Sequence, residues 1–309
     1  MSVLKTRRHA VEVLLGLGVG VCSPICRRAN AEMTHRELAF THQPELRSRA
    51  PWLTLPPTPA LPHAMRSGLT AINGTRIFFA QFGAGPPVLL LHGGLANSDY
   101  WGHQIRQLAQ IYSVTVMDTR GHGRSPVTSA YFSYPLFAQD VIALLNFLKI
   151  PQTSVIGWSV GAITGLQLAM TNPDRISQLF AFGANSSIDG LKAAGGRSSV
   201  FVLFAKRCKT EYGLLSPQPE KWPELINGLR VMWRNEPNFT TQKLHTVTVP
   251  TTISDGDYDE IVKRDHTEQL ANAIPGARLV IQRAVSHFAM LQDPDQFNKA
   301  LIDFLSGQN

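Results

Sequence analysis

The sequence predicts an α/β fold with a mostly parallel sheet of about eight strands, flanked by helices and carrying a helical cap insertion. Two observations support this prediction. Short apolar runs, such as residues 87–91, suit strands that are buried on both faces of a parallel sheet. Segments of helical periodicity alternate with these runs, which favours a doubly wound arrangement. The chain has 309 residues, of which 44% are hydrophobic and 17% charged, so it has the composition of a globular protein.

The expected sheet begins with a hairpin. Residues 69–72 and 76–82 flank Asn73-Gly74, a dipeptide that favours a tight turn between antiparallel strands. The remaining strands are expected at residues 87–91, 114–117, 154–156, 179–182, 249–253 and 278–281. The helical patterns lie at residues 101–109, 136–148, 160–170, 265–274 and 294–305.

Residues 185–245 interrupt this alternation. They contain an apolar stretch at 200–205 and a section with proline and tryptophan that runs through Trp233. We interpret residues 185–245 as a helical cap over the sheet, because no internal repeat is visible. The apolar side chains of the cap either line a pocket or only pack the cap onto the sheet; they are Phe201, Val202, Leu203, Phe204, Trp222, Met232 and Trp233.

The formal charge of +7 does not indicate a nucleic-acid-binding face. Residues 1–31 contain five basic side chains against one acid, and the rest of the chain carries a net charge of only +3. That remainder has no basic stripe or block of the kind that binds a phosphate backbone. The three cysteines exclude a disulfide scaffold, and no apolar run reaches the roughly 20 residues needed to span a bilayer.

Residues 1–31 have the pattern of an export signal. Basic residues at 5–9 precede an apolar stretch at 10–22 and the cleavage-type triplet Ala29-Asn30-Ala31. The segment around Arg7-Arg8 resembles a twin-arginine signal, which predicts a periplasmic or secreted protein. The alternative is a cytoplasmic protein with an irregular N-terminus. Residues 32–66 contain six prolines, and we interpret them as a linker or as an arm on the surface of a catalytic domain at 67–309.

Candidate catalytic groups lie at three expected strand ends. Gly157-Trp158-Ser159-Val160-Gly161 fits G-x-S-x-G, a tight strand-to-helix turn that exposes a serine. A serine hydroxyl needs a base that is itself oriented by an acid. Asp259 and His287 follow the two last expected strands, which gives the chain order Ser, Asp, His.

Taken together, these motifs resemble the α/β-hydrolase family from about residue 68 to the C-terminus. His92-Gly93-Gly94 resembles the oxyanion loop of that family, and residues 118–125 fit its D-x-R-G-x-G-x-S segment. The resemblance implies Ser159 as nucleophile, His287 as base and backbone N–H groups of Gly94 and Val160 as the oxyanion hole. It also implies Asp259 as the acid, because this residue is the third after Gly256.

Other acids and histidines compete for these roles. We expect Asp255 and Asp257 to form loop turns, and His92, His122 and His266 to be structural. The chain departs from the family at Ser286, where glycine is common before the histidine. The strand before the acid, Thr251-Thr252-Ile253-Ser254-Asp255, is also more polar than a buried strand should be.

The predicted activity is hydrolysis of a carboxylic ester or lactone of a small, largely apolar substrate through an acyl-enzyme intermediate. The likeness to enol-lactonases favours a lactone only by analogy. The alternatives are a ligand-binding protein with little or no turnover, an acyltransferase and a cofactor-free peroxidase. No motif calls for a cofactor or a metal ion. The sequence does not indicate an oligomeric state.

Overall fold

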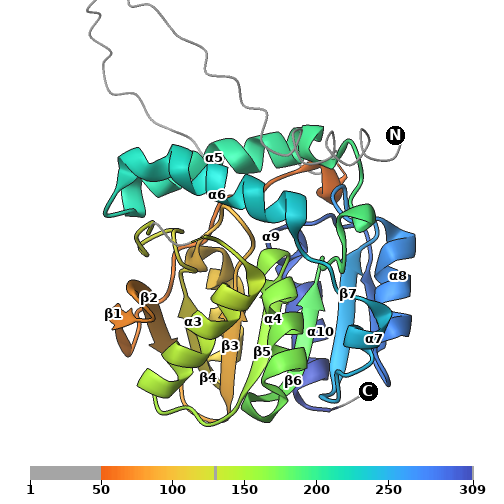
Figure 1. Cartoon of the computed structure of the whole chain (residues 1–309), viewed down its shortest axis with the longest axis horizontal. Helices are drawn as coiled ribbons and strands as arrows, with labels where there is room; N and C mark the ends of the chain where they lie inside the picture. Colours follow the sequence, from red (N-terminus) through yellow and green to blue (C-terminus); the bar gives the residue numbers. More distant parts are fainter. Residues whose placement is uncertain (1–49, 129–130, 308–309) are drawn as a thin grey trace, which may run out of the picture.

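A computed structural model describes residues 50–128 and 131–307, which form one eight-stranded sheet with helices on both faces (Figure 1). The strand order is β1-β2-β4-β3-β5-β6-β7-β8. β1 pairs with β2, and β2 with β4, in antiparallel register; every later pairing is parallel. The predicted fold class is therefore confirmed. The strands are β1 (Arg66–Ile72), β2 (Thr75–Phe82), β3 (Pro87–Leu91), β4 (Ser113–Met117), β5 (Thr153–Trp158), β6 (Ile176–Phe182), β7 (Thr251–Gly256) and β8 (Arg278–Gln282).

Helices cover both faces of the sheet. α3 (Tyr134–Phe147) packs against α4 (Val160–Thr171) on one face, and α4 lies over β5 and β6. α2 (Gly102–Leu108) packs against α10 (Pro294–Leu305) on the other face. α8 (Arg264–Ala273) contacts β7 and β8, and the short α9 (Ala289–Gln292) precedes α10. Because β5 has helices on both sides, all six of its residues are buried, as its apolar sequence predicts.

The polar strand β7 is buried with hydrogen-bond partners. The Thr251 hydroxyl donates to the Val249 carbonyl over 2.8 Å, and the Ser254 hydroxyl accepts from the Gln282 amide over 3.4 Å. Buried polar groups with partners cost little stability, so the composition of this strand is compatible with its place in the sheet.

The expected cap segment contains α5 (Ser199–Leu215) and α6 (Trp222–Asn235), which lie across one end of the sheet (Figure 1). This is the end at which the parallel strands terminate, because α4 starts there after β5. The short helix α7 (Thr241–Leu244) packs beside α8 in the main layer instead. The two long cap helices therefore cover the loops that carry the candidate catalytic residues.

Residues 50–65 lie between the cap and the main domain. They contain one short 3-10 helix (Pro51–Leu53), and Leu55 and Leu61 pack against the core. Two side chains of α5 hold this segment: the Arg207 guanidinium donates to the Leu55 carbonyl over 2.8 Å, and Glu211 accepts from the Thr58 hydroxyl. The expected export signal at 1–31 and residues 32–49 of the expected arm lie outside the described residues. Within residues 50–128 and 131–307, no helix is long and apolar enough to cross a membrane.

Candidate active site

Ser159 sits on a strained turn between β5 and α4. Its backbone has φ 54° and ψ −116°, a conformation that L residues rarely adopt. The turn is tight on both sides of the serine. A Cβ at Gly157 would lie 2.5 Å from the Ala162 backbone, and a Cβ at Gly161 would lie 2.1 Å from the Leu91 carbonyl oxygen. The two glycines of the motif are therefore required by space, and they allow the serine to project from the end of the sheet.

The structure brings Asp259 and His287 into direct contact. Asp259 follows β7, His287 follows β8, and the imidazole Nδ1 lies 2.6 Å from the Asp259 Oδ2. The other carboxylate oxygen, Oδ1, accepts from the backbone N–H groups of Ile261 and Val262 over 2.6 and 2.7 Å. Both side chains are almost fully buried. The carboxylate is thus held in place by the backbone and in turn orients the imidazole.

The electrostatics of this pair favour an ionised acid and a strengthened base. Burial disfavours the charged form of His287, but the charge and hydrogen bond of Asp259 outweigh it and raise the histidine pKa above 6.5. Burial also opposes the charged form of Asp259. The facing imidazole and the hydrogen bonds to this carboxylate overcome that effect and lower its pKa. Asp259 can therefore remain an anion while His287 takes up a proton.

The neighbouring aspartates have different environments. Asp257 is exposed and forms an ion pair with Arg264 over 3.2 Å, in the turn after β7. The expectation that Asp255 also forms a loop turn is wrong, because it lies within β7 and is 1% exposed. Its carboxyl accepts from the Thr267 hydroxyl over 2.7 Å and shares a hydrogen bond with Asp259. Burial and the adjacent Asp259 charge raise the pKa of Asp255 well above its usual range, which favours the protonated form of this carboxyl.

The competing histidines lie elsewhere in the fold. The His92 ring lies between the Gly93 carbonyl, 2.7 Å from Nδ1, and the Thr119 N–H, which donates to Nε2 over 2.9 Å. The His122 ring packs beside the His92 ring. His266 is in α8, where its Nε2 accepts from the Ser186 backbone N–H over 3.0 Å. These contacts give each ring a structural role.

Gly94 and Val160 lie side by side next to Ser159. A Cβ at Gly94 would lie 2.9 Å from Val160 Cγ2 and 2.5 Å from the Trp233 ring, so the site has room only for glycine. Val160 is the first residue of α4, and its N–H has no acceptor within the helix. Both residues line the same pocket as Ser159. The Val160 N–H is therefore available to a group bound at the serine, whereas the donor role of Gly94 stays a prediction.

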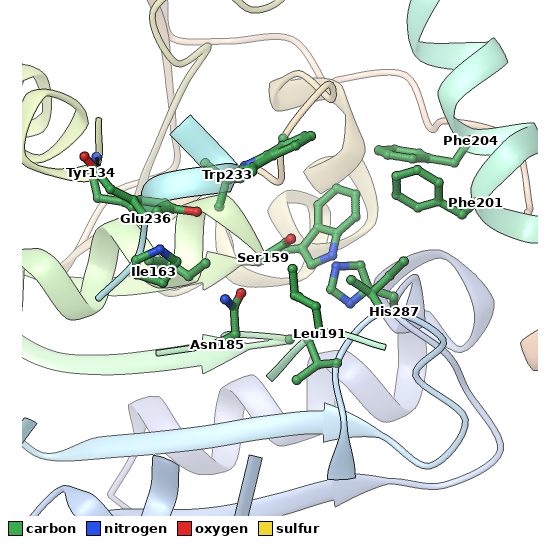
Figure 2. Close-up of a pocket in the computed structure, with 17 residues that line it drawn as sticks. Tyr134, Ser159, Ile163, Asn185, Leu191, Phe201, Phe204, Trp233, Glu236 and His287 are labelled. Atoms are coloured by element: carbon green, nitrogen blue, oxygen red, sulfur yellow. Dashed lines mark hydrogen bonds between the residues drawn. The ribbon is translucent and has the colours of Figure 1, made fainter. Parts of the chain in front are cut away.

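Ser159 and His287 open into a pocket beneath the cap (Figure 2). The space free of atoms in this pocket, open solvent included, is about 600 Å³. Cap residues Phe201, Phe204 and Trp233 line it, so these side chains contribute to a pocket as well as to packing. Phe204 also packs on Phe288, with ring centroids 4.8 Å apart.

Ser286, where the family commonly has glycine, is part of a hydrogen-bond chain. Its N–H donates to Gln292 Oε1 over 2.7 Å, and its hydroxyl accepts from Gln292 Nε2 over 3.0 Å. The same amide nitrogen donates to the Thr54 carbonyl over 2.8 Å. Through Gln292, the serine at this position connects the loop that carries His287 to the segment at residues 50–65.

Several residues of the site were not predicted from the sequence. Glu260 is half-buried, and its Oε2 accepts from the His287 backbone N–H over 3.2 Å. Burial, reinforced by the charge of Asp259, raises the pKa of Glu260. Lys192 donates to the Asp259 carbonyl. Glu236 and Asn185 line the pocket. Of these residues, only Glu260 could have been found from the sequence, because it directly follows Asp259. The others reach the site through tertiary packing.

No group of three or more His, Cys, Asp or Glu side chains that could hold a metal ion occurs in the part of the chain that the structure describes. The described cysteine, Cys208, is free and buried, with its sulfur 3.5 Å from the Tyr100 hydroxyl.

The chain is similar in sequence to known hydrolases. A family model described as alpha/beta hydrolase fold matches residues 86–208. The serine hydrolase BPHL of Homo sapiens is 30% identical over 264 residues, which cover 81% of this chain and 89% of that protein. A putative carbamate hydrolase RutD of Pseudomonas syringae is 28% identical, over 75% of this chain and 98% of that protein.

Lactone-cleaving proteins are also among the relatives. The 3-oxoadipate enol-lactonase 2 of Acinetobacter baylyi is 27% identical, over 72% of this chain and 90% of that protein. The structure of Est816, described as an N-acyl homoserine lactone degrading enzyme, is 25% identical with a TM-score of 0.61. That match covers 77% of this chain and all of the Est816 chain.

Proposed function

This chain belongs to the α/β-hydrolase fold family and its relatives are hydrolases, and on that basis we propose that it cleaves a carboxylic ester or lactone through an acyl-enzyme at Ser159. One observation carries the proposal: Ser159 on its strained turn shares a pocket with His287, whose Nδ1 is held 2.6 Å from Asp259. A nucleophile, a base and an orienting acid are the three groups that acyl transfer needs.

In the proposed reaction the Ser159 hydroxyl attacks the substrate carbonyl carbon while His287 Nε2 takes its proton. The negative charge that develops on the carbonyl oxygen faces the N–H groups of Gly94 and Val160. His287 then protonates the leaving oxygen, and the bond between that oxygen and the carbonyl carbon breaks. Water, deprotonated by the same imidazole, attacks the acyl-enzyme and releases the acid and Ser159. Throughout, Asp259 fixes the histidine tautomer and stabilises the imidazolium.

The test is hydrolysis of p-nitrophenyl esters from acetate to decanoate, beside a panel of small lactones and an aryl carbamate. Each substrate is run with the parent protein and with Ser159→Ala, and the thermal midpoint of both proteins shows that the variant is folded. We expect turnover that disappears in Ser159→Ala, with an optimum at short to medium acyl chains. Turnover that persists in the folded variant would contradict the assignment of the nucleophile.

The aryl carbamate in this panel tests a second candidate function, carbamate hydrolysis. The relation to RutD favours a carbamate substrate, whose carbonyl could be attacked by the same serine. Higher kcat/KM for the aryl carbamate than for every ester and lactone would replace the ester or lactone proposal. Products measured with a competing alcohol or with hydrogen peroxide would reveal acyl transfer or peroxidase activity.

We also propose export of the protein, a proposal that rests on the sequence of residues 1–31 alone. N-terminal sequencing of the protein from its native cells tests this. A mature end at Glu32 supports cleavage after Ala31, and an intact Met1 in the cytoplasmic fraction rejects it.

A further inference from the structure

A carboxylate lies in the pocket on the other side of the serine from the catalytic histidine. Glu236 follows the last residue of α6 and lines the pocket together with Ser159 (Figure 2). One of its oxygens, Oε2, accepts from the Tyr134 backbone N–H over 2.9 Å. Tyr134 is the first residue of α3, where a carboxylate also interacts favourably with the helix dipole. This bond engages Oε2 and leaves Oε1 to face other partners.

No positive side chain among the described residues lines the pocket to balance this charge. Apart from Glu236 and His287, every lining side chain is uncharged, and most are apolar or aromatic. His287 already has Asp259 as its partner. A carboxylate that faces an apolar pocket is costly unless a cation or donors meet it. Among the described lining residues, the Glu236 carboxylate therefore has no cationic partner, and a bound cation would supply one.

Two further groups around Glu236 suit a cation. The Asn185 amide nitrogen donates to the Ser187 carbonyl over 3.0 Å, so its oxygen remains as the acceptor on this side of the pocket. The Trp233 ring borders the same region (Figure 2). An indole face attracts cations through its quadrupole. A carboxylate, an amide oxygen and an indole face are the kinds of group that bind organic ammonium ions.

The position of His287 determines which half of the substrate reaches Glu236. His287 must protonate the leaving oxygen, so the leaving group lies on the histidine side of Ser159, where Phe201 and Phe204 are (Figure 2). Glu236 and Asn185 lie on the opposite side of the serine. The acyl half of the substrate therefore points toward Glu236.

We propose that the substrate carries an organic cation on its acyl half, bound by Glu236 together with Asn185 and Trp233. This inference deepens the proposed function and rests on it. It assigns Glu236 the role of a specificity-determining residue for a cationic ester or lactone. The competing explanation is that Glu236 only caps α3 through Tyr134.

The test compares esters that differ only in charge. The p-nitrophenyl esters of 4-(trimethylammonio)butanoate and 5,5-dimethylhexanoate have the same shape, because a quaternary nitrogen replaces a quaternary carbon. We expect the parent protein to prefer the cationic ester, and Glu236→Gln to lower the ratio of the two kcat/KM values about tenfold. Glu224→Gln removes the same charge from the exposed side of α6 and is the matched control, with an unchanged ratio.

Two results would overturn the proposal: a neutral ester preferred by the parent protein, or the same ratio in the parent and Glu236→Gln proteins. If Glu236 only caps α3, Glu236→Gln lowers the thermal midpoint and leaves the ratio as it was. A fall of the ratio in Glu224→Gln equal to that in Glu236→Gln would show a general charge effect and would also overturn it.

A binding measurement separates this proposal from the proposed hydrolysis and needs no Glu236 variant. Choline and 3,3-dimethyl-1-butanol are the same charged and neutral pair, and Trp158 and Trp233 line the pocket as fluorescent reporters. We expect choline to change the tryptophan fluorescence at lower concentration than the alcohol does. If no ester is hydrolysed but choline is preferred, the proposed function fails and the cation site stands. If esters are hydrolysed and the alcohol binds as well as choline, the cation site fails alone.

Discussion

Asp259 Oδ2 lies 2.6 Å from His287 Nδ1, while Asp259 Oδ1 is held by two backbone N–H groups. The carboxylate has no freedom to turn away, because both oxygens are engaged. This arrangement favours the tautomer with the proton on Nδ1, so that Nε2 carries no proton and can act as the proposed base. The orientation of the base is thus set by the loop after β7, and His287 itself contributes only the ring.

Replacing Asp259 by asparagine is expected to lower kcat/KM about 10³- to 10⁴-fold for the best ester or lactone, because an amide favours the wrong tautomer. The thermal midpoint should change little compared with the loss of rate. Steady-state kinetics of purified Asp259→Asn check this. Near-normal rates in Asp259→Asn, with large losses in Asp255→Asn, would instead assign the acid to Asp255.

The pH dependence of kcat/KM should report the pKa of His287. Because Asp259 raises this pKa above 6.5, activity should rise with pH through a midpoint above that value, as the imidazole loses its proton. Asp259→Asn removes the charge that raises the His287 pKa. The residual activity of this variant should therefore rise with pH through a lower midpoint. A midpoint that is the same in both proteins would contradict the role given to the Asp259 charge.

The same shift makes a prediction for stability. A histidine with a raised pKa in the folded state stabilises the protein most below the unfolded-state pKa, near 6.5. This contribution is lost as the pH rises through the folded-state pKa. Urea unfolding of the parent and of His287→Gln at pH 6 and pH 9 should therefore show a larger difference at pH 6. An equal difference at both values would argue against the shift.

Most of the fold could be predicted from the sequence because its signals are local. The apolar run of β3 and the Asn73-Gly74 turn each depend on neighbouring residues only. The positions of Ser159, Asp259 and His287 after β5, β7 and β8 could likewise be predicted, because the motifs follow apolar runs in the sequence; their catalytic roles stay a prediction.

What could not be predicted depends on distant parts of the chain. The sequence of β7 does not show that the buried Asp255 accepts a hydrogen bond from Thr267 of α8. Glu236 reaches the pocket only through the path of the cap, and it meets Tyr134 from 102 positions away. Such pairings follow from the packing of whole elements, which periodicity does not encode.

Asp255 should tolerate asparagine but not alanine. Its carboxyl has a raised pKa, so the folded state holds a proton that the unfolded chain releases near pH 3.8, and stability falls as the pH rises above that value. Asparagine keeps an uncharged group that can accept from Gly256 and donate to Asp259, so this variant should be as stable as the parent or more stable at pH 8. Alanine leaves the Gly256 and Thr267 donors without their carboxylate acceptor, at about 1 to 3 kcal/mol. Equal destabilisation by both variants in urea would contradict a protonated Asp255.

Gly183 makes room for the imidazole of His287, the proposed base. It has φ +64°, and a Cβ there would lie 2.7 Å from His287 Cε1. Gly183→Ala should therefore cost about 1 kcal/mol in backbone strain and should also displace the imidazole, with a loss of kcat. Gly276 has φ +69° and nothing within 4 Å of a Cβ, so Gly276→Ala is the matched control for strain alone. Activity lost equally in both variants would show that the displacement of His287 does not matter.

Gln292 joins three parts of the molecule: the loop of the base at Ser286, the helix α9 and the segment at residues 50–65. Its replacement by alanine removes all three hydrogen bonds, and we expect a loss of stability of about 1 to 3 kcal/mol together with a lower kcat. Ser286→Gly keeps the N–H donor and loses only the hydroxyl, so its effect should be smaller.

Gln296→Ala is the matched control for that prediction. The Gln296 side chain bridges the N–H and carbonyl of Arg283, and among the described residues it makes no hydrogen bond to residues 50–65. Gln296→Ala should lower the urea midpoint without lowering kcat, because it leaves the loop of His287 attached through Gln292. If Gln292→Ala and Gln296→Ala lower stability alike and neither alters kcat, the chain through Ser286 serves folding alone. A fall in kcat confined to Gln292→Ala means that the hydrogen bonds of Gln292 to Thr54 and Ser286 hold His287 in position.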